Sequence, residues 1–333
     1  MKKFKGIGKL IGGALMAMVL CSELASAQQT VTNLATFGLI SDTHVCDKAD
    51  QSKSIALVAT PRYFTGGPQK IAAFAESMNE TGADFIAELG DFTDNPKDAK
   101  LPAEQRKTAA LGFMDTAEAK LALFKGPRYH VFGNHDTDQV SKEDFLSKVT
   151  NTGIDPKATY YSFDAKGLHV VVLDSSFKTD GASYSGVPGT PGSGYAWDDA
   201  NIPAAELEWL KADLAKAKSP VIVLTHQQLN NQELLDPAYD PKHTVRNAPE
   251  VRAILEGSKK VLAVFGGHYH DGGFQEINNI KYIVLQANAA YGNDATYHNQ
   301  YSVVKVFAEG NNYTLALAGN GGQKSYSFSK VIN

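Results

Sequence analysis

The sequence predicts a layered α/β fold with mixed sheets, and two observations lead to this prediction. Short runs of apolar residues, which are typical of buried strands, alternate with longer stretches of helical periodicity along the 333-residue chain. The last two runs follow each other across a short polar turn, which indicates antiparallel strands at the C-terminal end. The composition, with 43% hydrophobic and 20% charged residues, is that of a globular protein.

The strand-like runs combine β-branched, aromatic and other apolar residues, and turn residues separate them. YSVVKVF (301–307) and YTLALAG (313–319) flank the segment AEGNN and predict a β-hairpin. The earlier runs are TFGLIS (36–41), DFIAEL (84–89), RYHVF (128–132), LHVVVLD (168–174), PVIVLT (220–225), KVLAVF (260–265) and KYIVLQA (281–287).

The stretches between these runs have the period of amphipathic helices. Within 203–217, for example, Leu207, Leu210 and Leu214 fall mainly on one stripe, whereas the charged residues lie elsewhere. Pro249 stands where the first turn of a helix accepts proline. The predicted helices cover residues 68–80, about 103–124, 141–149, 203–217 and 247–256.

One long segment, residues 179–203, is rich in Gly, Pro and Ser and predicts a surface loop. Loops of this length in a compact domain often border an active site. A tolerated surface insertion is an equally valid interpretation of the same composition.

The N-terminal segment has the order of a secretory signal peptide. The basic stretch MKKFKGIGK precedes the apolar stretch LIGGALMAMVL and the small residues ASA, which predicts cleavage after Ala27. The apolar stretch is too short for a stable membrane span, although a membrane anchor is the alternative. We therefore expect a periplasmic or secreted protein in which residues 28–333 form a single domain. Because only Cys46 remains after cleavage, no disulfide can form within that domain.

The charge balance argues against one class of partner. The chain has 36 acidic and 32 basic residues, a formal net charge of −4. Proteins that bind nucleic acid without sequence preference depend on a basic surface. We therefore expect no nucleic-acid partner, and the sequence leaves the oligomeric state open.

Polar residues with metal-binding side chains follow five of the predicted strands. In open α/β sheets, ligands gather at the carboxyl ends of the strands, so these residues should meet at one edge. The groups, each at the end of an apolar run, are Asp42-Thr43-His44, Gly90-Asp91, Gly133-Asn134-His135-Asp136, His226 and Gly266-Gly267-His268-Tyr269-His270.

These residue types fit a site for two divalent ions. A carboxylate such as Asp91 can bridge two ions, and imidazoles and further oxygen ligands complete each shell. Any one of the groups is weak by itself, but their joint occurrence in this order makes coincidence implausible. The remaining histidines, interpreted as structural or surface residues, are His130, His169, His243 and His298.

The series D-x-H, G-D, G-N-H-D, H and G-H-x-H resembles that of the calcineurin-like metallophosphoesterase family, over roughly residues 36–290. The resemblance implies a four-layer α/β/β/α sandwich with mixed sheets and two divalent metal ions, which could be Mn, Zn, Fe or Mg. It implies that the first metal binds Asp42, His44 and His270, that the second binds Asn134, His226 and His268, and that Asp91 bridges both.

The same resemblance implies a catalytic histidine, His135, with the adjacent Asp136 as its orienting partner. Metal-activated hydroxide would attack the phosphorus of a phosphate ester or phosphoanhydride. His135 would donate a proton to the leaving oxygen or stabilise charge on the phosphoryl group. Asp94 stands where the purple acid phosphatases carry a tyrosine, so their iron–tyrosinate colour is not expected.

A weaker resemblance points to the manganese-dependent ADP-ribose/CDP-alcohol diphosphatase branch. The stretches concerned are PRYF (61–64), YYSF (160–163), ELEWLKADL (206–214) and GHYHDGGF (267–274). They favour a small phosphorylated substrate of the nucleoside-diphosphate type, because arginine can clamp a phosphate and aromatic rings can stack on a base. The candidate substrate contacts are Arg62, Tyr63, Arg246, Tyr269 and Phe274.

Other functions remain open at this point. The chain could be a broad-specificity phosphomonoesterase resembling alkaline phosphatase, or a phosphodiesterase. Zinc amidohydrolases and lactamase-like hydrolases also use His-x-His, but usually place it early in the chain. A non-catalytic metal-binding protein is the remote alternative, and the presence of His135 argues against it.

Overall fold

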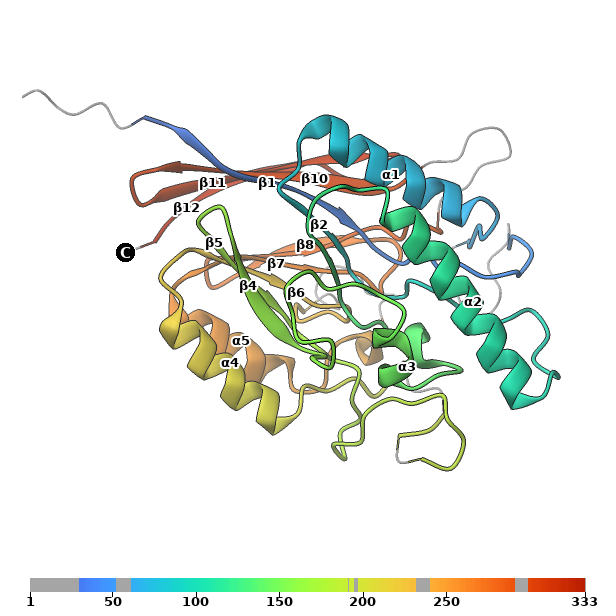
Figure 1. Ribbon diagram of the computed structural model, residues 1–333. Coiled ribbons are helices and arrows are strands. Elements are labelled where there is room, and N and C mark those ends of the chain that lie inside the picture. Colours follow the sequence, from blue (N-terminus) through green and yellow to red (C-terminus); the bar gives the residue numbers. More distant parts are fainter. Residues whose placement is uncertain are drawn as a thin grey trace, which may run out of the picture. The chain divides into compact units, whose positions relative to one another are not determined.

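Two six-stranded sheets form the body of the protein in the computed structural model (Figure 1). All of the helices and strands that the structure describes belong to one compact unit, Val31–Asn333. In the part of the chain that the structure describes, no helix has the length and apolar character needed to cross a membrane. The predicted signal peptide lies outside the described residues, which are 30–51, 61–190, 192–194, 197–231, 240–290 and 299–332.

The first sheet has the strand order β12-β11-β10-β1-β2-β3. Strands β1, β2 and β3 are parallel, whereas β10, β11 and β12 continue the sheet in antiparallel fashion. The predicted hairpin is therefore confirmed as β10–β11. The strands are β1 (Thr32–Ile40), β2 (Phe85–Glu88), β3 (Arg128–His130), β10 (Tyr301–Glu309), β11 (Asn312–Asn320) and β12 (Tyr326–Val331).

The second sheet has the strand order β4-β5-β6-β7-β9-β8. Its four central strands are parallel, and β4 and β8 pair antiparallel at the two edges. The strands are β4 (Tyr161–Ala165), β5 (Leu168–Val172), β6 (Val221–Leu224), β7 (Val261–Gly266), β8 (Gly273–Ile277) and β9 (Ile280–Val284).

The helices cover the outer faces of the two sheets, and a separate core fills the space between the sheets. Phe37, Phe85 and Phe265 belong to this central core, in which Phe37 stacks on Phe85 at 4.7 Å between ring centroids. One outer core contains apolar residues of α1 (Gly67–Thr81) and α2 (Ala103–Leu121), and the other contains those of α4 (Ala204–Lys216) and α5 (Ala248–Ser258). The layers follow the order α/β/β/α, which confirms the expected fold class (Figure 1).

Three short helices complete the elements of the described residues, and they lie in loops near the strand ends. They are η1 (His135–Thr137), α3 (Lys142–Leu146) and η3 (Pro241–His243). The predicted helix over 141–149 is shorter in the structure. Ser141 caps its start, and the helix ends at Leu146. A predicted long loop over 179–203 is confirmed as a segment without helix or strand in its described residues.

Candidate metal centre

The predicted metal ligands follow five strands, but these strands belong to both sheets. Asp42, Asp91 and Asn134 follow β1, β2 and β3 of the first sheet, and His226 and His268 follow β6 and β7 of the second. The carboxyl ends of the two sheets therefore face one shared site. This differs from the single sheet edge on which the sequence argument relied, although the residues do meet as expected.

Six of the predicted ligands fall into two compact groups that could each hold a metal ion. Within each group the potential ligand atoms lie within 4.8 Å of one another. Every member has an exposed fraction below one tenth, so the ligand atoms are removed from bulk water. The first group consists of Asp42, His44 and His270, and the second consists of Asp91, His226 and His268.

Asp91 lies between the two groups. Its Oδ2 atom is 3.3 Å from Nε2 of His226 in the second group and 3.7 Å from Nε2 of His44 in the first. Its Oδ1 atom accepts a hydrogen bond from the backbone N–H of His135 at 2.8 Å. The carboxylate is thus placed to serve both ions, as the sequence resemblance implied.

Unpaired polar atoms show that the residues fit bound cations. The Nε2 atoms of His226 and His268 are buried without a hydrogen-bond partner, and so are both amide atoms of the Asn134 side chain. His44 and His270 direct their Nε2 atoms at each other at 3.2 Å. Unpaired buried polar atoms are costly in a folded protein, whereas imidazole, amide and carboxylate ligands suit Mn, Zn and Fe. The donor set therefore fits two divalent ions.

Four residues of the two metal groups have a strained backbone conformation. Asp42, His44, Asp91 and His268 have φ values of 54°, 47°, 55° and 67°, in the left-handed region that residues other than glycine rarely adopt. Each such residue costs on the order of 1–3 kcal/mol. Hydrogen bonds over-determine the conformation, because Asp42 N donates to Gly90 O and His44 N donates to Asp91 O.

Two glycines allow the loops to approach each other closely. A Cβ atom on Gly133 would lie 2.0 Å from the backbone nitrogen of Asp91. A Cβ atom on Gly90, whose φ is 97°, would lie 2.5 Å from Nδ1 of His226. The glycines in GD and GNHD are thus required by packing around Asp91.

Burial and nearby charges change the pKa values of the ligand histidines in different directions, and burial and then Arg62 lower the pKa of His44 to about 4. Burial alone would lower the pKa of His226, but Asp91 and then Asp42 raise it to about 10. The His226 ring is held by its Nδ1 atom, which is 2.8 Å from the carbonyl oxygen of Leu89, so that Nε2 faces Asp91. The negative charges of Asp91 and Asp42 favour a proton on the His226 imidazole. The same charges would favour a metal ion bound to that imidazole instead of the proton.

His135 lies beside the first group but its partner is not the predicted one. Its Nδ1 atom is 2.7 Å from Oδ2 of Asp138 and 3.5 Å from Oδ1 of Asp94. Burial would lower the pKa of His135, but Asp138 and Asp94 raise it to about 9. The ring packs against that of His44 at 5.1 Å between centroids. Asp138 is therefore the residue that orients His135.

Asp136 has a different role, so its prediction as the orienting partner is wrong. Its Oδ2 atom accepts hydrogen bonds from the backbone N–H groups of Asp91 at 3.0 Å and Gly133 at 2.9 Å. Its Oδ1 atom accepts one from Thr93 at 3.2 Å. Asp136 therefore ties the loops after β2 and β3 together and supports Asp91 from behind.

Asp94 is a residue of the centre that the sequence reasoning missed. It lies 3.4 Å from Nδ1 of His44 and holds two cations, with Lys48 at 2.8 Å and Arg62 at 3.6 Å. The signal for it was the spacing GDFTD, since a residue three positions after Asp91 in the same loop stays near the strand end. Arg62, a predicted substrate contact, is thus brought to the first metal group. Tyr63, the next residue after Arg62, donates a hydrogen bond from its backbone N–H to the carbonyl oxygen of Ala289 at 2.7 Å.

The other predicted substrate contacts lie in different environments. Tyr269, between two ligands, approaches His243 at 5.9 Å between ring centroids. Arg246 is exposed and donates to the carbonyl oxygen of Asp198. Phe274 stacks on Tyr326 at 4.8 Å between ring centroids and packs against the central core, and its contact with substrate stays a prediction.

The histidines interpreted as structural divide into two kinds. His130 and His169 bind carboxylates of the scaffold, with His130 3.1 Å from Glu118 and His169 2.8 Å from Asp213. His243 departs from that interpretation, because its ring centroid lies 5.1 Å from that of the ligand His268. His298 lies outside the described residues.

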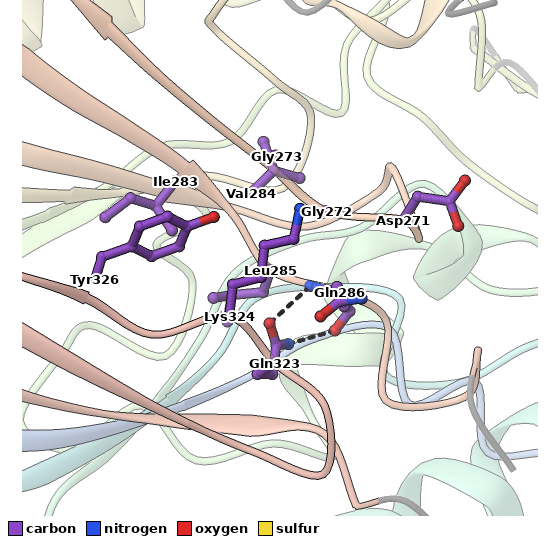
Figure 2. Close-up of a pocket in the computed structure, with 10 residues that line it drawn as sticks. All are labelled: Asp271, Gly272, Gly273, Ile283, Val284, Leu285, Gln286, Gln323, Lys324 and Tyr326. Carbon is purple, nitrogen blue, oxygen red and sulfur yellow. Dashed lines mark hydrogen bonds between the residues drawn. The ribbon is translucent and has the colours of Figure 1, made fainter. Parts of the chain in front are cut away.

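Gln323 binds the segment after β9 that contacts the backbone of one ligand (Figure 2). Its side chain accepts a hydrogen bond from the backbone N–H of Gln286 at 3.1 Å and donates one to the carbonyl oxygen of the same residue at 2.6 Å. The next residue, Ala287, donates to the carbonyl oxygen of His270 at 3.0 Å. The turn between β11 and β12 thereby fixes the backbone next to a ligand.

Comparisons with known proteins agree with this geometry. A curated relative from Arabidopsis thaliana, named manganese-dependent ADP-ribose/CDP-alcohol diphosphatase, is 24% identical over 81% of this chain and 94% of its own length. A relative from Fibrobacter succinogenes, named probable cyclic nucleotide phosphodiesterase, is 25% identical over 70% of this chain and 72% of its own length.

The fold is shared with a solved structure, a dimetal phosphatase from Danio rerio. Its TM-score is 0.68 at 18% identity, and the match covers 91% of this chain and 100% of that protein. The sequence profile of the calcineurin-like phosphoesterase family matches residues 35–272, a range that contains all of the ligands in the two metal groups. The chain therefore belongs to the calcineurin-like phosphoesterase family, and it is a metal-dependent phosphoric ester hydrolase.

Proposed function

We propose that this enzyme hydrolyses the phosphoanhydride bond of a nucleoside-diphosphate-type substrate and releases two monophosphates. The observation that carries the proposal is a pair of cationic side chains beside the first metal group. Lys48 and Arg62 are both held by Asp94, which contacts His44. A second phosphate group, next to the one at the metals, would meet these cations.

The environment of Arg62 supports an anionic partner. Its side chain is 16% exposed, and its Nε atom is buried without a hydrogen-bond partner. Its ion pair with Asp94, at 3.6 Å, is long and leaves donor capacity on the guanidinium group. A phosphate oxygen is a ligand that would satisfy such a donor. The relative from Arabidopsis thaliana, which bears the name of a diphosphatase, favours the same substrate class and favours Mn²⁺.

The residues described above would hold the metals and orient the substrate. When bound, two divalent ions would neutralise charge on the phosphoryl oxygens and provide a water molecule of lowered pKa as nucleophile. His135, protonated through its contacts with Asp138 and Asp94, would hold a proton on Nε2 for the leaving oxygen, because Nδ1 is occupied by Asp138. The burial of Asp42, His44 and Asp91 excludes bulk water from the ligand atoms.

A phosphodiesterase acting on cyclic nucleotides is the second candidate. The relative from Fibrobacter succinogenes, which is matched as closely as the diphosphatase in identity, favours it. A cyclic diester has no second phosphate group, so this function would leave Lys48 and Arg62 without a use in substrate binding.

A substrate panel tests the proposal. The purified protein, loaded with Mn²⁺, is incubated with ADP-ribose, a CDP-alcohol, a cyclic nucleotide and p-nitrophenyl phosphate, and the products are identified by mass spectrometry. We expect two monophosphates from the first two substrates and loss of the activity with chelator. Turnover of the cyclic nucleotide or the monoester, with the diphosphates left intact, would refute the diphosphatase proposal.

We further propose that the enzyme acts outside the cytoplasm, as the basic and apolar order of residues 1–27 supports. The test is the N-terminal sequence of the protein recovered from a periplasmic or culture fraction. Cleavage after Ala27 is expected, and an intact N-terminus found in the cytoplasmic fraction would overturn the proposal.

A further inference from the structure

Three aromatic side chains gather beside the second metal group. The ring centroids of Trp197 and His243 lie 4.7 Å apart, and those of His243 and Tyr269 lie 5.9 Å apart. The ring centroid of the ligand His268 lies 5.1 Å from that of His243 and 6.5 Å from that of Trp197. We call Trp197, His243 and Tyr269 the aromatic cluster.

The members of the cluster come from three separate segments. Trp197 stands in the Gly- and Pro-rich loop before α4, His243 ends the short helix η3 after β6, and Tyr269 lies between two ligands after β7. Aromatic rings brought together from distant segments at the edge of a site are not a by-product of one local motif. Their position beside His268 calls for an explanation.

Core packing does not provide this explanation. Trp197, His243 and Tyr269 are all partly exposed, whereas the neighbouring His268 is 8% exposed. Among the described residues, the three hydrophobic cores include the other tryptophan, Trp209, as a partly buried member but neither Trp197 nor Tyr269. Partly exposed tryptophan and tyrosine rings are typical of binding surfaces, because they offer a large apolar face at low entropic cost.

The two sides of the centre are chemically different. Beside the first group, next to His44, lie Lys48 and Arg62; beside the second group, next to His268, lies the aromatic cluster. Because Asp91 stands between the groups, a substrate at the metals would have one arm near the cations and the other near the rings.

We propose that the aromatic cluster is a subsite for the flat heterocycle of the substrate, with Trp197 as its main stacking surface. This rests on the function proposed above, and it adds the orientation of the substrate: the base on the side of His268 and the far phosphate on the side of His44. Stacking of a base on an aromatic ring is sequence-tolerant and substantial, so its loss should lower kcat/KM by about tenfold to a hundredfold.

The first experiment compares Trp197→Leu with Trp197→Phe on two substrates. One is a CDP-alcohol, and the other is a dialkyl diphosphate, which has the same phosphoanhydride but no ring. We expect Trp197→Leu to lower kcat/KM about tenfold to a hundredfold for the CDP-alcohol only, and Trp197→Phe to retain most of it. An equal loss on both substrates would show that Trp197 only supports the loop and would overturn the subsite.

The second experiment measures binding without turnover. The chain has two tryptophans, so the Trp209→Phe variant leaves Trp197 as its only indole. Trp209 packs against Tyr160 with the ring planes tilted at 55°, and circular dichroism and activity measurements would verify that the variant is intact. We expect CMP or AMP to quench the fluorescence of Trp197 and glycerol phosphate, added as the control, to leave it unchanged. Equal responses to the nucleotide and to glycerol phosphate would overturn the subsite.

These readouts separate the two proposals. If CMP quenches Trp197 but no diphosphate is hydrolysed, the subsite stands and the diphosphatase function fails. If diphosphates are hydrolysed but Trp197→Leu affects the CDP-alcohol no more than the dialkyl diphosphate, the function stands and the subsite fails.

Discussion

The carboxylate of Asp91 and the imidazole of His226 face each other at 3.3 Å, although the two residues follow strands of different sheets. This contact joins the carboxyl ends of β2 and β6. It brings the layers of the fold together at the point where both metal groups share one carboxylate. The centre is thus built across the sandwich and depends on the packing of both sheets.

Asp91→Asn should be the most damaging single change among the ligands. The variant keeps the shape of the side chain but loses the charge that serves both groups, so we expect loss of bound metal together with loss of activity. Elemental analysis and circular dichroism would measure metal content and folding. Asp115→Asn, at an exposed helix position, is the matched control. Full metal occupancy with near-normal turnover would contradict the assignment of Asp91 to both ions.

His135→Ala should lower the rate and leave the metals in place. The residue is not a member of the ligand set, and loss of a general acid typically costs about 10²–10⁴-fold. The loss should be smaller for substrates with good leaving groups, such as p-nitrophenyl esters, because these need no proton on the leaving oxygen. The same loss for good and poor leaving groups would leave only electrostatic stabilisation as the role of His135.

The variants Asp138→Asn and Asp136→Asn should distinguish the roles of these two aspartates near His135. Asp138 binds the imidazole, so its variant should lower kcat with normal metal content. Asp136 binds the backbone of Asp91, Thr93 and Gly133, so its variant should lose metal and thermal stability. Identical behaviour of the two variants in metal analysis and thermal melts would refute this division.

The sequence was sufficient to predict the central strands and the residues at their ends. Strands such as β6 and β7 are buried throughout, so they appear as uninterrupted apolar runs. The edge strands β4, β8 and β12 were missed because one face of each is partly exposed and polar residues interrupt the pattern; β12 alternates along its whole length.

The missed residues of the site have equally physical reasons. Asp138 contacts His135 because the chain forms the 3-10 helix η1, in which residues three positions apart lie on the same side. The sequence argument relied on adjacency in the chain, which favoured Asp136. His243 reaches His268 only through the packing of two loops that are distant in sequence, so no local pattern could indicate it.

Arg62→Ala should raise KM more than it lowers kcat. Arg62 approaches the centre through Asp94 and is placed to bind the second phosphate in the ground state and the transition state alike. Arg246→Ala is the matched control, since that arginine is exposed and donates to a backbone carbonyl. Steady-state kinetics with ADP-ribose would measure KM and kcat for the two variants. If Arg246→Ala raises KM and Arg62→Ala does not, the distal phosphate lies on the other side of the centre.

Because of His130, the free energy of unfolding should decrease as the pH becomes alkaline. The ring is buried with Nε2 3.1 Å from Glu118 and Nδ1 3.8 Å from Glu88. Burial would lower the pKa of His130, but the two carboxylates raise it to about 9, from 6.5 for an unperturbed histidine. Because the folded-state pKa lies above the unfolded one, the stabilisation is complete below about pH 6.5 and disappears as the pH rises through about 9.

The His130→Gln variant tests this dependence. It should have a lower free energy of unfolding than the wild type at neutral pH, because Glu118 and Glu88 lose a cationic partner inside the protein. Between about pH 6.5 and pH 9 its stability should fall less than that of the wild type, since the group that releases the proton is gone. Denaturant titrations at several pH values would measure both effects, in metal-loaded protein so that the centre stays constant. Parallel curves for the two proteins across this range would show that His130 is neutral in the folded state, and that Glu118 or Glu88 carries the proton instead.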